Sequence, residues 1–255
     1  MSVVEVRQHG SRVDIVLNRP DKLNAMDPEV FESLGAAADA AAGLDPRVVV
    51  VRGEGRSFSA GIDTSSFGSV AGSPEEGIAR AQAGFRKIAA LPMPTIAAVQ
   101  GHALGAGLQL ALACDLRVCT KTSSLGLLEH RYGIVPDLGG TQRLPLLVGS
   151  GHAKKLIWLA ERIDGVEAHR IGLAEVIADD DSLFDVVDDL AQRIADAPPL
   201  AVRAAKELVD LAGCVRNEAG MDAEARHQAG LLVSGDFVEA ISAFLEGRSP
   251  TYKGE

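Results

Sequence analysis

Cysteine is scarce in this chain of 255 residues, and the cysteines present are not arranged for cross-linking or metal binding. The three cysteines, Cys114, Cys119 and Cys214, form an odd number, and no two of them have the C-x-x-C spacing. A disulfide framework and a structural zinc site are therefore not expected, and this usage fits a reducing cytosol. The N-terminus lacks the basic start and apolar run of a secretory signal, so we expect a cytoplasmic protein.

Basic residues are also fewer than acidic ones. The chain has 25 Lys and Arg against 35 Asp and Glu, which gives a formal net charge of -10. A protein this acidic repels nucleic acid phosphates unless it carries a basic patch, and none is visible, so nucleic acid is not an expected partner. With 47% hydrophobic and 24% charged residues, the composition is that of a globular protein able to bury a large core.

Residues 88–114 contain no Asp, Glu, Lys or Arg, a run long enough to span the roughly 20 residues of a bilayer. Pro92 and Pro94 break a helix near its start, and several glycines with His102 and Gln109 interrupt the rest. We therefore predict a strand, a tight turn and a buried helix here, and no membrane partner.

The common catalytic signatures are absent as well. There is no G-x-S-x-G elbow, no P-loop and no H-E-x-x-H motif, and the six histidines are scattered. We predict no metal site. The glycine-rich segment 101–107 lies between a predicted strand and a predicted helix, but its spacing differs from G-x-G-x-x-G, so a dinucleotide cofactor has little support.

The hydrophobic pattern alternates between strands and helices over the first half of the chain. Strands are expected at 3–7, 12–18, 48–52, 95–100 and 115–120, and helices at 26–42, 74–90 and 105–114. This alternation predicts an α/β fold with a mostly parallel sheet.

After Gly139 the pattern is helical and poor in strands. Helices are expected at 150–161, 166–172, 181–197, 200–212, 218–231 and 235–246. Pro198-Pro199 is the best boundary, which divides the chain into a core at 1–197 and a helical region at 198–255. The apolar faces of the last helices predict either a subunit interface or packing on the chain's own sheet.

Two loops rich in small residues are candidates for binding an anion through the backbone. A glycine-rich turn that opens a helix leaves N–H groups at the positive end of the helix dipole, so the N–H of Ala106 can donate to a substrate oxygen. The second loop is Phe58–Asp63, which follows a buried strand. Two convergent N–H donors form an oxyanion hole, but the same small residues also fit tight packing of a helix on a sheet.

Two carboxylates, Glu129 and Asp137, lie eight residues apart with Pro136 and a glycine between them, so we expect both on loops. Apolar neighbours tend to raise a carboxyl pKa, which suits a general acid or base near neutrality. The alternatives are solvated loop charges, a helix cap at Asp137, or ion pairs with Arg131 or Arg143.

Four motifs occur in order along the chain, and together they make it similar to the crotonase (enoyl-CoA hydratase/isomerase) superfamily. They are NRP at 18–20 with LNA at 23–25, FSAGID at 58–63, GHALGAG at 101–107 and PDLGGTQRL at 136–144. The similarity extends from residue 3 to residue 248. It implies a spiral of ββα units with a helical C-terminal trimerisation region, and hence a homotrimer or a dimer of trimers. It also implies an acyl-CoA substrate and no separate cofactor, because coenzyme A is part of the substrate.

The resemblance also assigns site residues by position. The oxyanion-hole donors are the backbone N–H groups of Ile62 and Ala106. Five residues match segments that line the coenzyme A moiety in the family: Lys22, Leu23, Ala25, Ala60 and Asp63. Phe244 and Lys253 match a C-terminal stretch that reaches the nucleotide, often on a neighbouring subunit.

Departures from the family pattern bear on the reaction. Hydratases of the family pair two glutamates; Glu129 matches one of them, but Gln109 stands in place of the other, and an amide does not exchange a proton near neutral pH. Asp137 occupies a position where many isomerases of the family carry a catalytic aspartate. We therefore predict double-bond isomerisation of an unsaturated fatty acyl-CoA by Glu129 and Asp137. The alternatives are a 2-enoyl-CoA hydratase and a catalytically weak acyl-CoA-binding scaffold.

Overall fold

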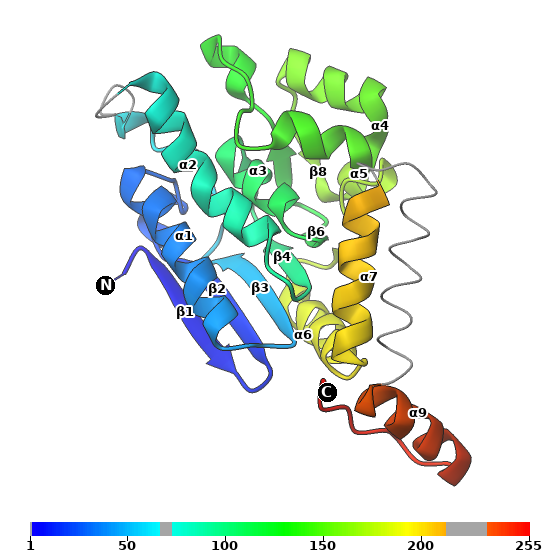
Figure 1. Ribbon diagram of the computed structural model, residues 1–255. Helices are drawn as coiled ribbons and strands as arrows, with labels where there is room; N and C mark the ends of the chain where they lie inside the picture. Colours follow the sequence, from blue (N-terminus) through cyan, green and yellow to red (C-terminus); the bar gives the residue numbers. More distant parts are fainter. Residues whose placement is uncertain (1, 67–72, 213–233) are drawn as a thin grey trace.

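The main sheet has six strands in the order β1-β2-β3-β4-β6-β9. The computed structural model describes residues 2–66, 73–212 and 234–255 (Figure 1). The strands are β1 (Val4–His9), β2 (Arg12–Leu17), β3 (Val48–Gly53), β4 (Thr95–Val99), β6 (Leu116–Thr120) and β9 (Val176–Ala178). Only the β1–β2 pair within this sheet is antiparallel, so the prediction of a mostly parallel sheet is confirmed.

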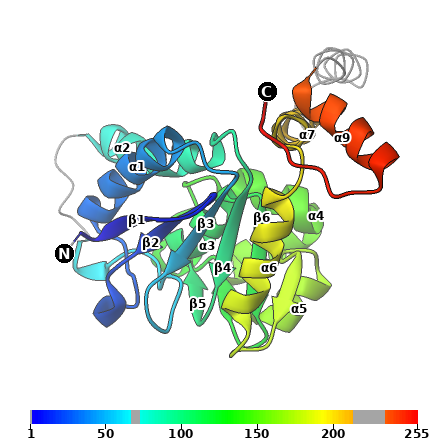
Figure 2. The ribbon, with the colours of Figure 1, turned by 90° about the horizontal axis from the view of Figure 1, so that it is seen from below.

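This sheet is apolar on both faces. Val49 and Val51 of β3 belong to the core shared with the helices α1 (Pro28–Gly43), α2 (Pro74–Ala89) and α3 (Ala106–Ala113). Val48 and Val50 belong to a second core, on the face that α6 (Leu183–Ala195) covers. Because side chains alternate along a strand, burial on both faces requires the continuous valine run of β3. Figure 2 shows helices on either side of the sheet.

A second sheet of three short strands lies beside α3. Its order is β5 (His102–Leu104), β7 (Ser124–Gly126) and β8 (Ile163–Asp164). Strands of two or three residues are too short to produce a periodic pattern, so the sequence did not predict them. The uncharged stretch 88–114 contains the predicted strand β4 and the predicted helix α3, with β5 in place of part of the expected turn. Among the described residues, no helix is both long and apolar enough to cross a membrane.

The later part of the chain is mainly helical. It contains α4 (Gly140–Leu159), α5 (Gly165–Arg170), α6, α7 (Pro199–Ala212) and α9 (Gly235–Glu246). The helix expected at 150–161 is the second part of α4, which begins at Gly140 and is kinked at Gly149. Pro145 and several glycines break the periodic pattern there, which hid the start of the helix. The predicted helix 218–231 and Cys214 lie outside the described residues.

Helix α7 is tied to the main sheet by Lys206. Its ammonium group donates to the carbonyl oxygen of Met93 at 3.2 Å and forms a 2.7 Å ion pair with Asp115. Helix α9 lies farther from the sheet (Figure 1) and exposes four large apolar side chains: Phe237, Val238, Ile241 and Leu245. The boundary at residue 198 and the subunit interface stay predictions.

Candidate active site

The loop that follows β3 is joined by backbone hydrogen bonds to the segment that follows β2. The N–H of Ala60 donates to the carbonyl of Leu23 at 2.9 Å, and the N–H of Met26 donates to the carbonyl of Gly61 at 2.7 Å. The N–H of Asp63 donates to the carbonyl of Met26 at 2.8 Å. The structure therefore brings together two segments of predicted substrate-binding residues that are far apart in the sequence.

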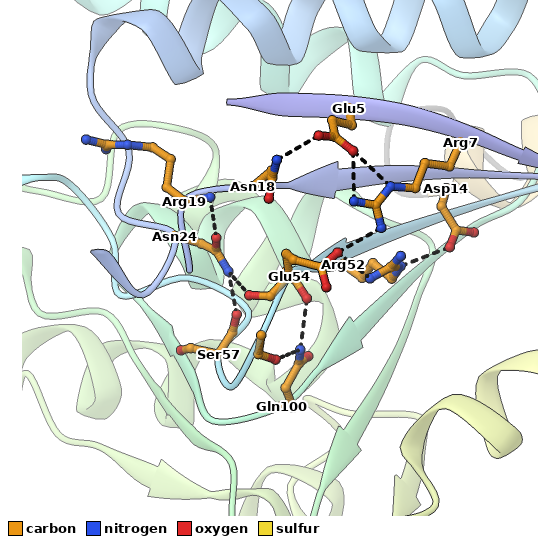
Figure 3. Close-up of polar contacts among 12 residues, drawn as sticks. Glu5, Arg7, Asp14, Asn18, Arg19, Asn24, Arg52, Glu54, Ser57 and Gln100 are labelled. Carbon is orange, nitrogen blue, oxygen red and sulfur yellow. Dashed lines mark hydrogen bonds and ion pairs between the residues drawn. The ribbon is translucent and has the colours of Figure 1, made fainter. Parts of the chain in front are cut away.

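Asn24 anchors this pair of segments. It is buried, and its Nδ2 donates to the carbonyl oxygens of Glu54 at 3.0 Å and Ser57 at 2.7 Å (Figure 3). Its Oδ1 accepts from the N–H of Arg19 at 2.8 Å. Its φ of 55° lies in the left-handed region, which asparagine tolerates better than most residues. Asn24 belongs to the quoted LNA motif, but sequence reasoning gave it no role.

Charged side chains surround the same segments. Lys22 ends a short 3-10 turn, η1 (Pro20–Lys22), and is exposed. Arg19 forms ion pairs with Asp27 at 3.1 Å and Asp63 at 3.2 Å, and it also donates to the carbonyl of Ala25. Hydrogen bonds from Ser65, aided by Arg19, lower the pKa of Asp63. The Asp63 carboxylate is thus already held by protein groups.

The glycine-rich segment 101–107 packs directly against this loop. The N–H of Ser59 donates to the carbonyl of His102 at 2.7 Å, and a Cβ on Gly107 would lie 2.5 Å from the carbonyl oxygen of Ser59. A Cβ on Gly61 would lie 2.6 Å from the carbonyl oxygen of Leu104 and 3.8 Å from the nitrogen of Ala106. The small residues therefore permit close packing, and that packing sets the two loops side by side.

The two predicted donors, the N–H groups of Ile62 and Ala106, sit at this junction. Ala106 is the first residue of α3, so its N–H has no partner within the helix. Met26 bonds to Gly61 and Asp63 on either side of Ile62, which leaves the Ile62 N–H directed away from Met26. Within the described residues, neither N–H donates a hydrogen bond. Both donors are therefore available to a ligand oxygen.

Glu129 lies against Gly105, the residue that precedes the donor Ala106. It begins the 3-10 turn η3 (Glu129–Tyr132) instead of an irregular loop, and it is only 7% exposed. Its Oε1 lies 3.4 Å from the position that a Cβ on Gly105 would take. Burial raises the pKa of Glu129, and the charge of Asp137 raises it further. Its Oε2 is buried without a hydrogen-bond partner in the described part of the chain, so this oxygen can exchange a proton with a substrate.

Gln109 on α3 holds Glu129 in place. Its Oε1 accepts from the N–H groups of Leu138 at 2.7 Å and Gly140 at 3.0 Å. A backbone N–H only donates, so the atom that receives both bonds must be the amide oxygen. Nε2 therefore faces Glu129 and donates to its Oε1 at 2.8 Å. Gln109 links the carboxylate of Glu129 to the backbone of the loop at 138–140.

Asp137 lies in that loop and is half-buried. Burial raises the pKa of Asp137, and its own backbone N–H opposes the shift. The residue that caps α4 is Gly139, so Asp137 is not the helix cap that the sequence allowed. Arg131 donates instead to the carbonyl of Ala160. No ion pair of Glu129 or Asp137 occurs among the described residues, so the pairing with Arg131 or Arg143 is not found, and the catalytic roles of the two carboxylates stay predictions.

Sequence reasoning missed Gln82. This residue lies on α2, and its Nε2 donates to the backbone carbonyl of Asp137 at 2.5 Å. No motif marks it, because a glutamine on an amphipathic helix looks like an ordinary surface residue.

The C-terminal residues are not near the other site residues of the same chain. Arg47, immediately before β3, donates to the carbonyl of Tyr252 at 2.9 Å, so Lys253 lies beyond the start of β3, whereas the site loop follows its end. Phe244 lies in α9, and its side chain is outside the part of the chain that is described. Their contribution to a neighbouring subunit stays a prediction.

Comparison with known proteins places this geometry in a family. A family profile described as enoyl-CoA hydratase/isomerase matches residues 8–255. The chain belongs to this family. A probable enoyl-CoA hydratase of Bacillus subtilis is 37% identical over 238 residues, which cover 91% of this chain and 92% of the relative. An enoyl-CoA isomerase/hydratase of Mycosarcoma maydis is 36% identical over 212 residues, 82% of this chain and 77% of the relative.

Solved structures of the enoyl-CoA hydratase/isomerase family share the fold. An enoyl-CoA hydratase of Bacillus anthracis superposes with a TM-score of 0.93 at 35% identity, over 99% of this chain and 100% of that one. A putative enoyl-CoA hydratase of Thermobifida fusca in complex with acetoacetyl-CoA gives a TM-score of 0.84 at 36% identity, over 91% and 95%. The predicted crotonase-type fold is confirmed, and the chain is an enzyme of this superfamily.

Proposed function

We propose that this enzyme is an enoyl-CoA isomerase that moves a double bond along an unsaturated fatty acyl-CoA. The observation that carries the proposal is the hydrogen bonding of Gln109, whose oxygen is taken by two backbone N–H groups and whose nitrogen serves Glu129. An amide does not transfer protons near neutral pH. Glu129 and Asp137 are therefore the two groups left for proton transfer, and double-bond migration needs two such groups.

In this reaction the thioester carbonyl oxygen accepts hydrogen bonds from the N–H groups of Ile62 and Ala106. Negative charge develops on that oxygen when a proton leaves the neighbouring carbon. A preorganised donor of this kind stabilises the transition state by roughly 3 to 4 kcal/mol. The start of α3 adds the positive end of its dipole at Ala106.

Glu129 is the proposed base. Because its carboxylate lies against Gly105, next to Ala106, it is close to the carbon that adjoins a carbonyl bound there. For a 3-enoyl thioester, Glu129 takes a proton from that carbon and the electron pair of the broken C–H bond forms the dienolate. Asp137 then donates its proton to the fourth carbon, which leaves a 2-enoyl thioester. The product is an isomer of the substrate, so the reaction involves no net oxidation or reduction and needs no redox cofactor.

The pKa shifts of the two carboxyls suit one of them accepting a proton while the other donates one. Burial raises the pKa of both Glu129 and Asp137, and the charge of Asp137 adds to the shift of Glu129. Two nearby carboxylates disfavour double ionisation, so the pair retains one proton to a higher pH than solvated carboxyls do. One proton shared between two groups is what a base and an acid acting in turn require.

The substrate class rests on the family. The Thermobifida fusca protein of the same fold was solved with acetoacetyl-CoA, which supports binding of an acyl-CoA here. The segments that carry Lys22, Leu23 and Ala25 on one side and Ala60 and Asp63 on the other are the proposed contacts for coenzyme A. Their backbone pairing beside the two donors supports this assignment.

Hydration of a 2-enoyl-CoA is the second candidate. Relatives named as hydratases favour it, and so does the second hydrogen on Nε2 of Gln109. Only one hydrogen of that nitrogen is used in the described structure, for Glu129. The other can hold a water molecule beside the site.

One assay separates the two reactions. The purified protein is incubated with 3-enoyl-, 3,5-dienoyl- and 2-enoyl-CoA, and the products are separated by chromatography, which resolves the double-bond isomers, before their masses are measured. Migration leaves the mass unchanged, whereas hydration adds one water. We expect migration in the wild type and its loss in both Glu129→Gln and Asp137→Asn. Efficient hydration that Asp137→Asn leaves intact would instead establish the hydratase.

We also propose that the chain assembles as a trimer or a dimer of trimers. The exposed apolar side chains of α9 support this, because such residues are usually covered in an assembly. The location of Lys253, away from its own chain's site, fits a contribution to a neighbour. Light scattering tests the assembly, and a monomer mass would contradict it.

A further inference from the structure

One peptide unit in the site loop is held on both of its edges. The carbonyl oxygen of Asp137 accepts from Nε2 of Gln82 at 2.5 Å, and the N–H of Leu138 donates to Oε1 of Gln109 at 2.7 Å. These two groups belong to the same planar peptide bond. Two side-chain amides, from helices α2 and α3, therefore fix its plane.

The amide of Gln82 is itself oriented. Arg86, one turn further along α2, donates from Nη2 to Oε1 of Gln82 at 2.6 Å. This bond assigns the oxygen to the Arg86 side and leaves Nε2 to face the loop. Helix α2 is anchored in turn, because the ring of Phe85 is buried 6.1 Å from that of Phe31 on α1. Gln82 thus projects from a fixed element.

The residues on either side of Asp137, Pro136 and Leu138, are buried, whereas the segment before them is less restrained. Ile134 and Val135, just before Pro136, are 44% and 56% exposed. The Asp137 side chain forms no ion pair within the described residues. The position of its carboxyl is therefore set by these buried neighbours together with the restrained peptide that follows its Cα.

We propose that Gln82 is a positioning residue that sets the distance between the two carboxyls of the site. The bond to Gln82 fixes the Asp137 side of the peptide, while Gln109 ties the other side to Glu129. This inference rests on the proposed function, because it matters only if Asp137 donates a proton. Misplacement of a reacting group by about 1 Å can lower a rate by about 100-fold.

Two variants remove the donor while keeping the shape of the side chain. Gln82→Met has a similar length and no N–H, and Gln82→Glu keeps an oxygen for Arg86 but presents an acceptor to the Asp137 carbonyl. Gln192→Ala is the matched control, since Gln192 lies on α6 and its Nε2 donates to Asp196. The measurements are kcat and KM for migration, and exchange of the substrate's α-proton in D2O.

We expect both Gln82 variants to lower kcat for migration by about 10- to 100-fold. KM should stay within about twofold, because the groups that bind the thioester do not change. Exchange of the α-proton should persist, since Gln109 still holds Glu129. Gln192→Ala should match the wild type in all three measurements.

Asp137→Asn, measured in parallel, separates this inference from the proposed function. If Asp137→Asn migrates double bonds normally, the proposed function fails. If Asp137→Asn is inactive while both Gln82 variants keep the wild-type kcat, the positioning role is overturned. An equal loss of migration and exchange with a lower melting temperature would also overturn it, because that pattern indicates a structural role. Gln82→Glu alone decides the matter if Gln82→Met does not fold.

Discussion

The amide nitrogen of Gln109 lies 2.8 Å from Oε1 of Glu129 and donates a hydrogen bond to it. The bond engages one carboxylate oxygen and leaves the other, Oε2, buried without a partner in the described structure. The oxygen of the same amide holds the backbone at Leu138 and Gly140. A residue that cannot transfer a proton thus aligns one that can.

Replacing Glu129 by Gln should remove the base and leave the fold intact. We expect migration to fall by at least about 100-fold, since a positioned base contributes on the order of 100- to 10,000-fold.

Burial disfavours the charged carboxyl, so ionisation of Glu129 destabilises the folded state as pH rises through its raised pKa. The melting temperature of Glu129→Gln, relative to the wild type, should therefore increase with pH. Turnover assays and thermal scans at several pH values check both statements; a variant that unfolds early at every pH would contradict the second.

The pH dependence of the exchange reaction should report the environment of Glu129. A base must be ionised, and the pKa of Glu129 is raised above the usual 4.5. On the acidic side of the pH profile, kcat/KM for α-proton exchange should therefore fall with a midpoint above pH 4.5; this fall is the acidic limb of the profile. Asp137→Asn removes a negative charge that raises the pKa of Glu129, so the limb should move to lower pH. A limb that Asp137→Asn leaves in place would show that the two carboxyls do not interact.

Substituting Gly107 by Ala should push the two donor loops apart. The new Cβ would meet the carbonyl oxygen of Ser59 at 2.5 Å, so backbone must move. We expect a loss of about 1 to 3 kcal/mol in the free energy of unfolding, together with reduced turnover. Gly43→Ala is the control, because nothing lies within 4 Å of a Cβ there. Denaturant titration and turnover of both variants test this, and equal behaviour would refute the close packing.

Conservative changes of the Ile62 side chain should be tolerated better. The proposed donor is the backbone N–H, which Ile62→Val keeps. Ile62 is half-buried and packs against the main core, so loss of one methylene should cost about 0.5 to 1.5 kcal/mol of stability. We expect turnover of Ile62→Val to stay within about tenfold of the wild type, a change of barrier of roughly 1.4 kcal/mol or less. A much larger fall would mean that the side chain itself takes part in the reaction.

Gln109→Glu should change the balance between the two candidate reactions. Its carboxylate can still accept from Leu138 and Gly140, but it presents a like charge to Glu129 in place of a donor. We expect the pKa of the pair to rise and the ratio of hydration to migration to increase. Chromatography and mass spectrometry of the products from 2-enoyl- and 3-enoyl-CoA give the ratio. Gln109→Met, which offers neither donor nor acceptor, should lower both activities; an unchanged ratio in Gln109→Glu would show that this position does not select the reaction.

Much of the fold could be read from local patterns. The valine run of β3 predicted a strand, and the helix expected at 26–42 is α1, whose N-cap Asp27 accepts from the N–H of Val30 at 3.0 Å. The strands β5, β7 and β8 were not predicted, because strands of two or three residues leave no periodic signal. Helix α4 was placed too late because Pro145 and Gly149 interrupt its pattern.

For the candidate site, the sequence indicated the residues but not the surroundings of the two carboxylates. The motifs pointed to Ile62, Ala106 and Asp137, and the apolar neighbours of Glu129 pointed to that carboxylate. The sequence left open whether the two carboxylates are caps, ion-pair partners or reacting groups. Only their surroundings in space decide that, because burial and hydrogen bonding depend on what other segments bring close.

The sequence by itself determined the α/β class and the glycine-rich turns, and it showed that position 109 carries an amide in place of a carboxyl. These features depend only on residue type and on the order of neighbouring residues. Tertiary structure alone decided what Gln109 and Gln82 do. Both bind backbone of a loop that begins 27 and 54 residues later in the chain, at Pro136, and a hydrogen bond over such separations exists only once the helices have packed.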